Sequence, residues 1–173
     1  MDSRFFEYQG KLYPSYIRDG HAADFIIPAA YKFCIGVGLD IGGTKDCHYP
    51  DARIINLDQP DGYHATNLPD KKYDYIFSSH TLEHIENWLE TLAYWKGHLR
   101  EDGILFLYLP HPDMIYWRPS NCKKHRHIFT AEEITLALKG LGFQDILYSK
   151  RDLYWSFAVV AINRTEPKPK DKK

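Results

Sequence analysis

Two acidic residues, each close to the end of an apolar run, are the first side chains in this 173-residue sequence that point to chemistry. Asp40 belongs to the run 36–41 and is followed by the glycine pair Gly42-Gly43, and Asp58 closes the run Ile54–Leu57. An apolar strand, a glycine turn and an acid after the next strand form the nucleotide-binding half of a doubly wound sheet. There, backbone N–H groups of the turn hold the polar end of a ligand, and the acid accepts hydrogen bonds from ribose hydroxyls.

A second group of chemically capable residues is His80-Thr81-Leu82-Glu83-His84, which has the His-x-x-Glu-His spacing of a zinc-hydrolase signature. That signature requires a helix that carries both histidines on one face. Here His80 follows directly on Ser78-Ser79, the end of an expected strand, so a helix would have to begin at once. We therefore predict no metal site, with His80 at the rim of a ligand site and Leu82 in the core.

Two further polar segments each allow two readings. His111 follows another apolar run and could act as a general base, or it could simply pack between Pro110 and Pro112. A basic loop could bind an anionic ligand or be an ordinary solvated loop, and we favour the solvated one. Its basic residues are Arg118, Lys123, Lys124, His125, Arg126 and His127.

The elements that must position these residues alternate between strand and helix patterns. Apolar strand runs are expected at 36–41, 54–57, 73–79, 104–109, 143–149 and 154–163, and helical patterns at 24–33, 86–98 and 130–140. Asn87 is a candidate N-cap of the second helix, and Thr130 with Glu133 has the pattern of a capping box for the third. Such alternation predicts an α/β fold with a largely parallel sheet covered by helices.

The connection after the glycine turn is unusually short. Only nine residues, Thr44 to Ala52, separate Gly43 from Arg53, and they include Pro50. This is too short for a normal crossover helix, so we expect a loop or a single turn. Ligands of such sheets bind over the carboxyl ends of the strands. The segments to inspect are therefore 42–44, 58–59, 78–81 and 111–113.

Composition limits the class of protein. A formal net charge of −1 and a pI of about 6.7 argue against a binding surface for nucleic acid. No apolar run approaches the roughly 20 residues needed to cross a bilayer, and the first residues do not read as a signal peptide. Three cysteines without a Cys-x-x-Cys spacing suggest reduced thiols. We expect a cytoplasmic protein with one domain over residues 1–164 and a disordered polar tail over 165–173.

Four segments, in order and at matching spacing, resemble Rossmann-fold S-adenosylmethionine-dependent methyltransferases of the class I, type 11-like group. They are Asp40–Gly43, Leu68–Ile76, Ser78–Ile85 and Leu99–Leu105, the last being similar to the family's turn into its fifth strand. The closest subgroup has a truncated first crossover helix, as this chain does. The resemblance implies a doubly wound, mostly parallel sheet with an antiparallel C-terminal strand. It also implies S-adenosylmethionine as cofactor and methyl transfer to an unidentified acceptor, expected to be a small molecule.

The resemblance also implies roles for individual residues. Thr44 stands where the family commonly has glycine, and His64 stands where it commonly has the acid that meets the adenine amino group. The residues expected to bind the cofactor are Asp40, Gly42, Gly43, Thr44, Asp58, Gln59, His64, Ala65, Ser79 and His80. Those that could take part in catalysis are His80, His84 and His111.

Two alternative functions stay open at this point. One is a catalytically inactive module that binds S-adenosylmethionine or S-adenosylhomocysteine and acts through a partner, an idea motivated by the shortened crossover. A nicotinamide dehydrogenase is less favoured, because the full Gly-x-Gly-x-x-Gly motif is absent from the sequence. The oligomeric state is open, although aromatic residues expected to be exposed in the last strands would allow a homodimer.

Overall fold

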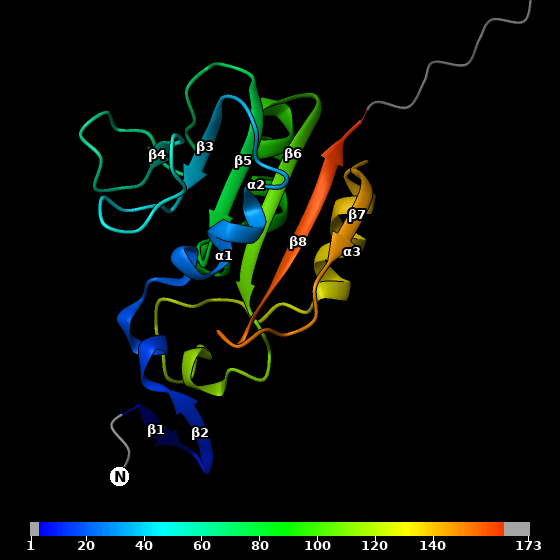
Figure 1. Cartoon of the computed structure of the whole chain (residues 1–173). Helices are drawn as coiled ribbons and strands as arrows, with labels where there is room; N and C mark the ends of the chain where they lie inside the picture. The colour runs from blue at the N-terminus through cyan, green and yellow to red at the C-terminus, as the bar shows by residue number, and fades with distance from the viewer. Residues whose placement is uncertain (1–3, 165–173) are drawn as a thin grey trace, which may run out of the picture.

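The computed structural model describes residues 4–164, and the predicted tail at 165–173 lies outside these residues. The chain forms one six-stranded sheet and a separate two-stranded hairpin (Figure 1). Across the sheet the strands lie in the order β4 (Arg53–Ile55), β3 (Gly38–Ile41), β5 (Tyr73–Ser79), β6 (Leu99–Pro110), β8 (Ser156–Asn163) and β7 (Gln144–Tyr148). The first four strands are parallel, and β8 pairs antiparallel with both β6 and β7. The predicted fold is confirmed, with β8 as the antiparallel C-terminal strand.

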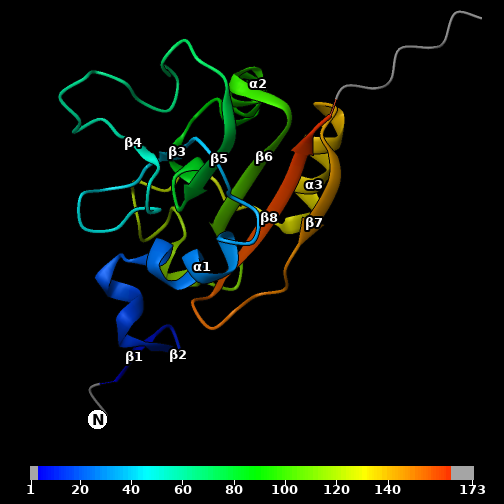
Figure 2. The same ribbon diagram turned by 45° about the horizontal axis from the view of Figure 1, so that its top comes forward.

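The helices cover the two faces of this sheet. The helix α1 (Ala22–Ala30) lies on one face, and α2 (Trp88–His98) and α3 (Ala131–Gly140) lie on the other (Figure 2). The strands supply both cores because successive side chains of a strand point to opposite faces. In β6, for example, Phe106 packs in the α1 core and Leu107 packs in the α2–α3 core.

The first crossover contains no helix, as its length predicts. Residues 42–52 form turns and bends between β3 and β4. The loop is tied to the sheet by the Asp40 carboxylate, which accepts a hydrogen bond of 2.6 Å from the backbone N–H of Tyr49. Between β4 and β5 the described chain forms no further strand, and the only pairing there is an isolated bridge between His64 and Asn67.

Several element boundaries agree with the sequence pattern. Strand β5 covers the predicted residues 73–79, and Asn87 occupies the N-cap position of α2, although its side chain makes no capping hydrogen bond. The capping box of α3 is present: the Thr130 hydroxyl accepts from the Glu133 N–H, and the Glu133 carboxylate accepts from the Thr130 N–H. These capping bonds satisfy N–H groups that a helix start otherwise leaves unpaired.

Two boundaries were predicted wrongly. The helix α1 covers Ala22–Ala30, where the sequence pattern predicted 24–33, and it contains Pro28 in its interior. Strand β6 begins at Leu99, where the sequence predicted a turn over residues 100–103, and its register against β5 shifts between Tyr73 and Tyr75. The residues of the expected turn are thus absorbed into an irregular extension of the strand, with Asp102 at a φ of 59°.

The N-terminal residues form an unpredicted substructure at the end of the sheet where β3, β5 and β6 terminate (Figure 1). It consists of the hairpin β1 (Phe5–Tyr8) with β2 (Lys11–Pro14) and the 3₁₀ helix η1 (Ser15–Asp19). A small hydrophobic core connects this substructure to residues in and near another 3₁₀ helix, η3 (Ile115–Trp117). The Tyr13 ring, for example, lies 4.6 Å from the Trp155 ring between centroids.

Three findings bear on other expectations from the sequence. None of the helices in residues 4–164 has the length and apolar character required to span a bilayer. Cys34, Cys47 and Cys122 are all free thiols. Of the aromatic residues in the segments predicted as the last strands, Tyr148 is exposed as expected, whereas Phe143, Tyr154 and Phe157 are buried. The homodimer stays a prediction.

Candidate functional site

Two adjoining cavities lie at the carboxyl ends of β3, β4 and β5. The larger has a volume of about 900 Å³ and the smaller about 110 Å³. Both are lined by Gly20, Ala22, Gly42, Thr44 and His80. The location is the one predicted for a ligand site in a doubly wound sheet.

The glycine turn is shaped by close packing inside the protein. Gly42 has a φ of 95°, a conformation that L side chains rarely adopt, and its N–H donates to the Ile55 carbonyl at 2.8 Å. A Cβ on Gly42 would lie 1.7 Å from Thr81 Oγ1, and one on Gly43 would lie 2.6 Å from Asp40 Oδ2. Both glycines are therefore required by the chain itself, and both also line a cavity.

Asp40 lies beneath this turn and is only 1% exposed. Burial raises the pKa of its carboxyl group to about 7, although hydrogen bonds from the backbone of Tyr49 and Gly43 lower the pKa in part. Asp40 lines the smaller cavity together with Ser79. The Ser79 hydroxyl is buried and has no hydrogen-bond partner within the described part of the chain. A polar group of a ligand in this cavity would find an acceptor and a free hydroxyl there.

Neither Asp58, which was predicted to hold the ribose, nor Gln59, which was predicted to bind the cofactor, lines either cavity. Asp58 is exposed, and its Oδ1 accepts a hydrogen bond of 3.1 Å from the Gln59 side chain. The cavity wall after β4 is formed instead by Asn56 and Leu57. Asn56 Nδ2 donates to the Gly43 carbonyl at 3.1 Å, so this side chain joins the two strand ends. Asn56 directly follows Ile55, the last residue of β4, and this position was the feature of the sequence that could have identified Asn56 as a cavity residue.

His64 and Ala65 line the large cavity, as predicted for an adenine-binding segment. The Ala65 carbonyl accepts a hydrogen bond of 2.7 Å from Trp95 Nε1 in the core, which fixes the path of this segment. His64 Nδ1 accepts from the Thr66 N–H at 3.4 Å. The remaining apolar residues nearby in the cavity wall are Ile55, Leu57 and Ile85.

His80 is held rigidly at the cavity rim. Its Nε2 lies 2.8 Å from Ser156 Oγ, and its ring centroid lies 4.8 Å from that of Trp117. Its φ of 47° is unusual for a residue other than glycine. Burial, with smaller contributions from His125 and His84, lowers the pKa of His80 to about 3, so the ring is neutral at physiological pH.

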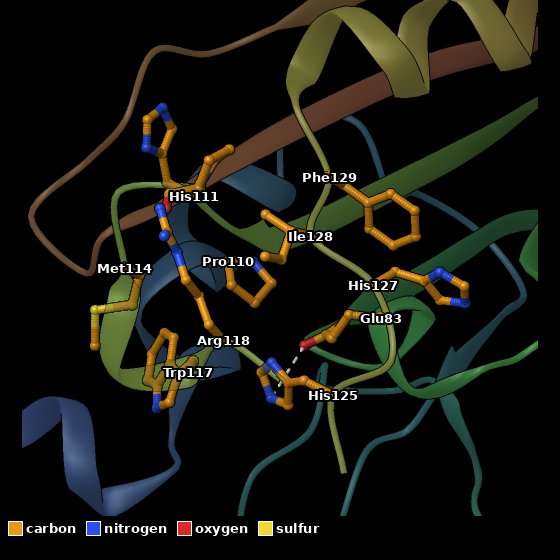
Figure 3. A pocket seen from close by; sticks show the side chains of 11 residues that line it. Glu83, Pro110, His111, Met114, Trp117, Arg118, His125, His127, Ile128 and Phe129 are labelled. Carbon is orange, nitrogen blue, oxygen red and sulfur yellow. Dashed lines mark hydrogen bonds and ion pairs between the residues drawn. The ribbon is translucent and has the colours of Figure 1, made fainter. Parts of the chain in front are cut away.

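His84 also lines the large cavity, and its Nδ1 lies 2.8 Å from the Lys124 carbonyl. His111 is placed elsewhere. It lines a separate hollow of about 10 Å³ together with Glu83 and His125 (Figure 3). It does not border the large cavity. Burial lowers the pKa of His111, although neighbouring Asp113 raises it in part. The structure therefore brings His80 and His84 together at the cavity and leaves His111 outside it.

Three groups of cavity residues were not predicted from the sequence. The first is an aromatic wall of Tyr116, Trp117 and Tyr154, in which the last two rings lie 5.7 Å apart. The second is the N-terminal stretch that closes one side, with Ile17 and Arg18. The third is a set of basic residues of the loop 118–127, for which the sequence favoured a solvated loop over one that binds an anion, together with Arg18. Arg18, Lys123, Lys124 and Arg126 all line the cavity, and its described lining contains no Asp or Glu.

Comparison with known proteins agrees with the family expected from the sequence. A family model described as a methyltransferase domain matches residues 18–148. No curated protein matches the chain. Many solved structures share its fold, although their sequence identities are low.

Two of these solved structures illustrate the range. A SAM-dependent methyltransferase from Thermotoga maritima, a possible histamine N-methyltransferase, has a TM-score of 0.65 and 14% identity, with 86% of this chain and 92% of that chain covered. Human N-acetylserotonin methyltransferase, solved in complex with SAM, has a TM-score of 0.57 and 15% identity, with 83% of this chain and 52% of that chain covered. This chain thus spans about half the length of some of the proteins that share its fold.

Proposed function

Because the chain belongs to the methyltransferase domain family, we propose that it transfers a methyl group from S-adenosylmethionine to a small anionic acceptor. The observation that carries this proposal is the cavity of about 900 Å³ at the strand ends, which joins the glycine turn to a basic loop. The family match and the neighbouring fold solved with SAM support the predicted cofactor. The side chains that line the cavity supply the contacts for both reactants.

The residues of the two cavities fit the cofactor part by part. The amino-acid end suits the smaller cavity, where Asp40 can accept from an ammonium group and the unpartnered Ser79 hydroxyl can bond a carboxylate. The adenosine end suits the apolar wall formed by Leu57, Ala65 and Ile85 in the larger cavity. When bound, S-adenosylmethionine supplies an electrophilic methyl group on a positively charged sulfur.

The aromatic wall offers a place for that positive charge. Cations bind favourably over the faces of Trp and Tyr rings, and Trp117 and Tyr154 stand beside His80 at the cavity. The neutral imidazole of His80 adds no opposing charge. These three side chains would therefore hold the sulfonium without repelling it and would help to exclude water from the reacting groups.

The charge of the cavity bears on the acceptor. Arg18, Lys123, Lys124 and Arg126 line it, with no acidic side chain in its described lining. A site with this charge favours an acceptor that carries a carboxylate, phosphate or similar group. Methyl transfer to a nucleophilic atom mainly requires alignment of the acceptor with the methyl group, so no general base is compulsory. His84 and His111 stay proposals as catalytic residues.

The ribose contact has two candidate side chains. Asp58 stays the predicted partner of the ribose hydroxyls, although Asn56 is the residue that borders the cavity. Substitution of each by alanine separates the two assignments. Removal of the side chain that binds ribose should lower the affinity for S-adenosylhomocysteine. The other alanine variant should bind S-adenosylhomocysteine like the wild type.

The direct test of the function is calorimetric titration with S-adenosylhomocysteine, followed by a methyl-transfer assay on a panel of small acids and phosphates. We expect one binding site per chain, and acceptors whose turnover falls when Lys123 and Lys124 are both changed to glutamine. Absence of cofactor binding in folded protein would contradict the proposal. Tight binding without transfer to any acceptor would favour the alternative of an inactive cofactor-binding module.

A further inference from the structure

A buried glutamate beside the cavity has no partner for its charge. Glu83 belongs to the 3₁₀ helix η2 (Leu82–His84) and is 1% exposed, and neither of its carboxylate oxygens has a hydrogen-bond partner among the described residues. Three imidazoles surround it. Its Oε1 lies 3.9 Å from Nδ1 of His80, 3.9 Å from Nε2 of His84 and 3.9 Å from Nε2 of His125. In Figure 3 the Glu83 side chain points toward the His125 ring.

Hydrogen bonds fix the tautomers of His84 and His80. In both rings the nitrogen that faces Glu83 is the one without a proton. A carbonyl oxygen can only accept, so His84 Nδ1 carries the proton that it shares with the Lys124 carbonyl, and His84 Nε2 presents a lone pair. Ser156 Oγ donates to the Tyr154 carbonyl, so it accepts from His80 Nε2, and His80 Nδ1 presents a lone pair. Lone pairs thus converge on a carboxylate, and the centre lacks a positive group.

We propose that Glu83, His84 and His125 bind a divalent transition-metal ion, with Zn²⁺ as the ion that suits this donor set. One nitrogen or oxygen from each of the three residues lies within 4.8 Å of the others. Two imidazoles and one carboxylate are the ligands of many zinc sites that keep a fourth position open. Ligand atoms in such a site lie roughly 3.3 Å apart, so small side-chain rotations would close the triad around the ion.

The backbone around the triad is already fixed, which lowers the cost of binding. The Glu83 carbonyl accepts from the Arg126 N–H at 2.8 Å and from the His127 N–H at 3.2 Å, so the segment that carries His125 is docked on η2. The carbonyl that orients His84 is that of Lys124, in the same segment. A ligating histidine whose second nitrogen bonds a carbonyl is the usual arrangement at metal sites.

The free coordination position would face the large cavity, because His84 and His125 both line it. His80, whose Nδ1 also lies 3.9 Å from Glu83 Oε1, would stand near the ion without being one of the three ligands. This arrangement differs from the zinc-hydrolase signature, which pairs His80 with His84. Here the partner of His84 is His125, which follows 41 residues later and which no short motif could connect to it.

The chemical alternative is that a proton, not a metal ion, satisfies the lone pairs. Burial raises the pKa of Glu83 to about 8, so a neutral carboxyl group could donate to one imidazole. The single proton of this carboxyl group could satisfy the lone pair of only one imidazole. The two states differ in a measurable way, since only the metal state binds a stoichiometric ion.

The test is a titration of the untagged chain, stripped with a chelator, with Co²⁺ as a spectroscopic probe and Zn²⁺ as its competitor. We expect one Co²⁺ per chain with visible bands of a four- or five-coordinate ion, and its displacement by one equivalent of Zn²⁺. Glu83→Gln and His125→Gln should each weaken binding at least tenfold. His98→Gln is the matched control, because His98 lies at the end of α2 and bonds the Tyr94 carbonyl.

Wild-type protein that is folded but binds no Co²⁺ would overturn the proposal, as would equal binding by all three variants. Should the variants fail to fold, nitrogen chemical shifts of the wild-type histidines decide the matter. Zn²⁺ must then shift His84 and His125 but leave His98 unchanged. Cofactor binding enters none of these measurements, so a negative result would leave the proposed methyl transfer intact.

Discussion

Asp40 combines a structural role with a place in the wall of the smaller cavity. It ties the crossover loop to β3 through Tyr49 and supports the turn at Gly43, and it also lines the smaller cavity. Burial raises the pKa of its carboxyl group to about 7. A cationic ligand group beside it would favour the ionised form, so cofactor binding and the protonation of Asp40 should be linked.

This raised pKa predicts a pH dependence of stability. Because the folded pKa of Asp40 exceeds its ordinary value of 3.8, folding takes up a proton between about pH 4 and pH 7. The contribution is fully present below about pH 4 and is lost as the pH rises through 7, at no more than about 1.4 kcal/mol per pH unit. Asp40→Asn should remove this slope. Urea unfolding of both proteins from pH 4 to pH 8 measures the difference, and parallel curves would contradict the assignment.

A side chain at position 42 should lower the stability of the fold. In Gly42→Ala the new methyl group would meet Thr81 Oγ1 at 1.7 Å and the backbone would be held at a φ of 95°. We expect a loss of roughly 2–4 kcal/mol in the free energy of unfolding. Gly62→Ala is the control, since Gly62 also has a positive φ, of 75°, but nothing lies within 4 Å of its Cβ position. Denaturant unfolding should show a clearly smaller loss for it, and equal losses would argue against the clash.

Some residues of the cavity could be placed from the sequence next to them, and others could not. Gly42, Thr44 and His80 follow strands directly, so the rule for parallel sheets places them at the cavity, as the structure does. Trp117 and His125 could not be placed in this way. They come from an irregular segment whose path depends on docking against η2 and the N-terminal hairpin, and no period in the sequence encodes that docking.

At the scale of elements, the apolar strands were the most predictable part of the fold. Strand β5 is largely buried on both faces and is built around the apolar residues Tyr75, Ile76 and Phe77, and its limits matched the prediction. The helix α1 was placed two residues late at its start because the prediction followed a pattern of apolar residues that begins after Asp24. Ala22 and Ala23 precede this pattern, yet they pack with Ile27 in the core and belong to the helix. The start of β6 was missed because a bulge with polar residues resembles a turn.

The capping box of α3 gives a prediction at this scale. Thr130→Ala removes the hydroxyl that accepts from the Glu133 N–H at 3.1 Å, so one orphan donor of the first turn loses its partner. The expected cost is about 1 kcal/mol, or roughly 2–4 °C in the melting temperature of a domain of this size. Thr130→Ser keeps the hydroxyl and should melt near the wild type. A Thr130→Ala variant as stable as the wild type would mean that packing alone sets the start of α3.

At the scale of the whole molecule, the cavity is assembled from segments far apart in the sequence. The glycine turn and β4 supply one side, η1 and the residues after it a second, and the segment 116–126 a third. Residues 4–17 precede the matched family region, which begins at residue 18. The hairpin in them packs through Phe6 against Tyr116, with ring centroids 4.9 Å apart. The hairpin therefore supports the cavity wall from behind, through the ring of Tyr116.

Ligand binding should consequently stabilise these distant segments together. The hairpin and η1 share a small core with η3, so without ligand their amides should exchange with solvent faster than those of β5 and β6. Saturation with S-adenosylhomocysteine should slow exchange in residues 15–20, 42–44 and 116–126, because each segment contributes to the cavity wall. The edge strand β7 lies outside the wall and should be unaffected. Hydrogen exchange read by mass spectrometry resolves these segments, and protection confined to residues 42–44 would mean that the N-terminal substructure does not respond to the cofactor.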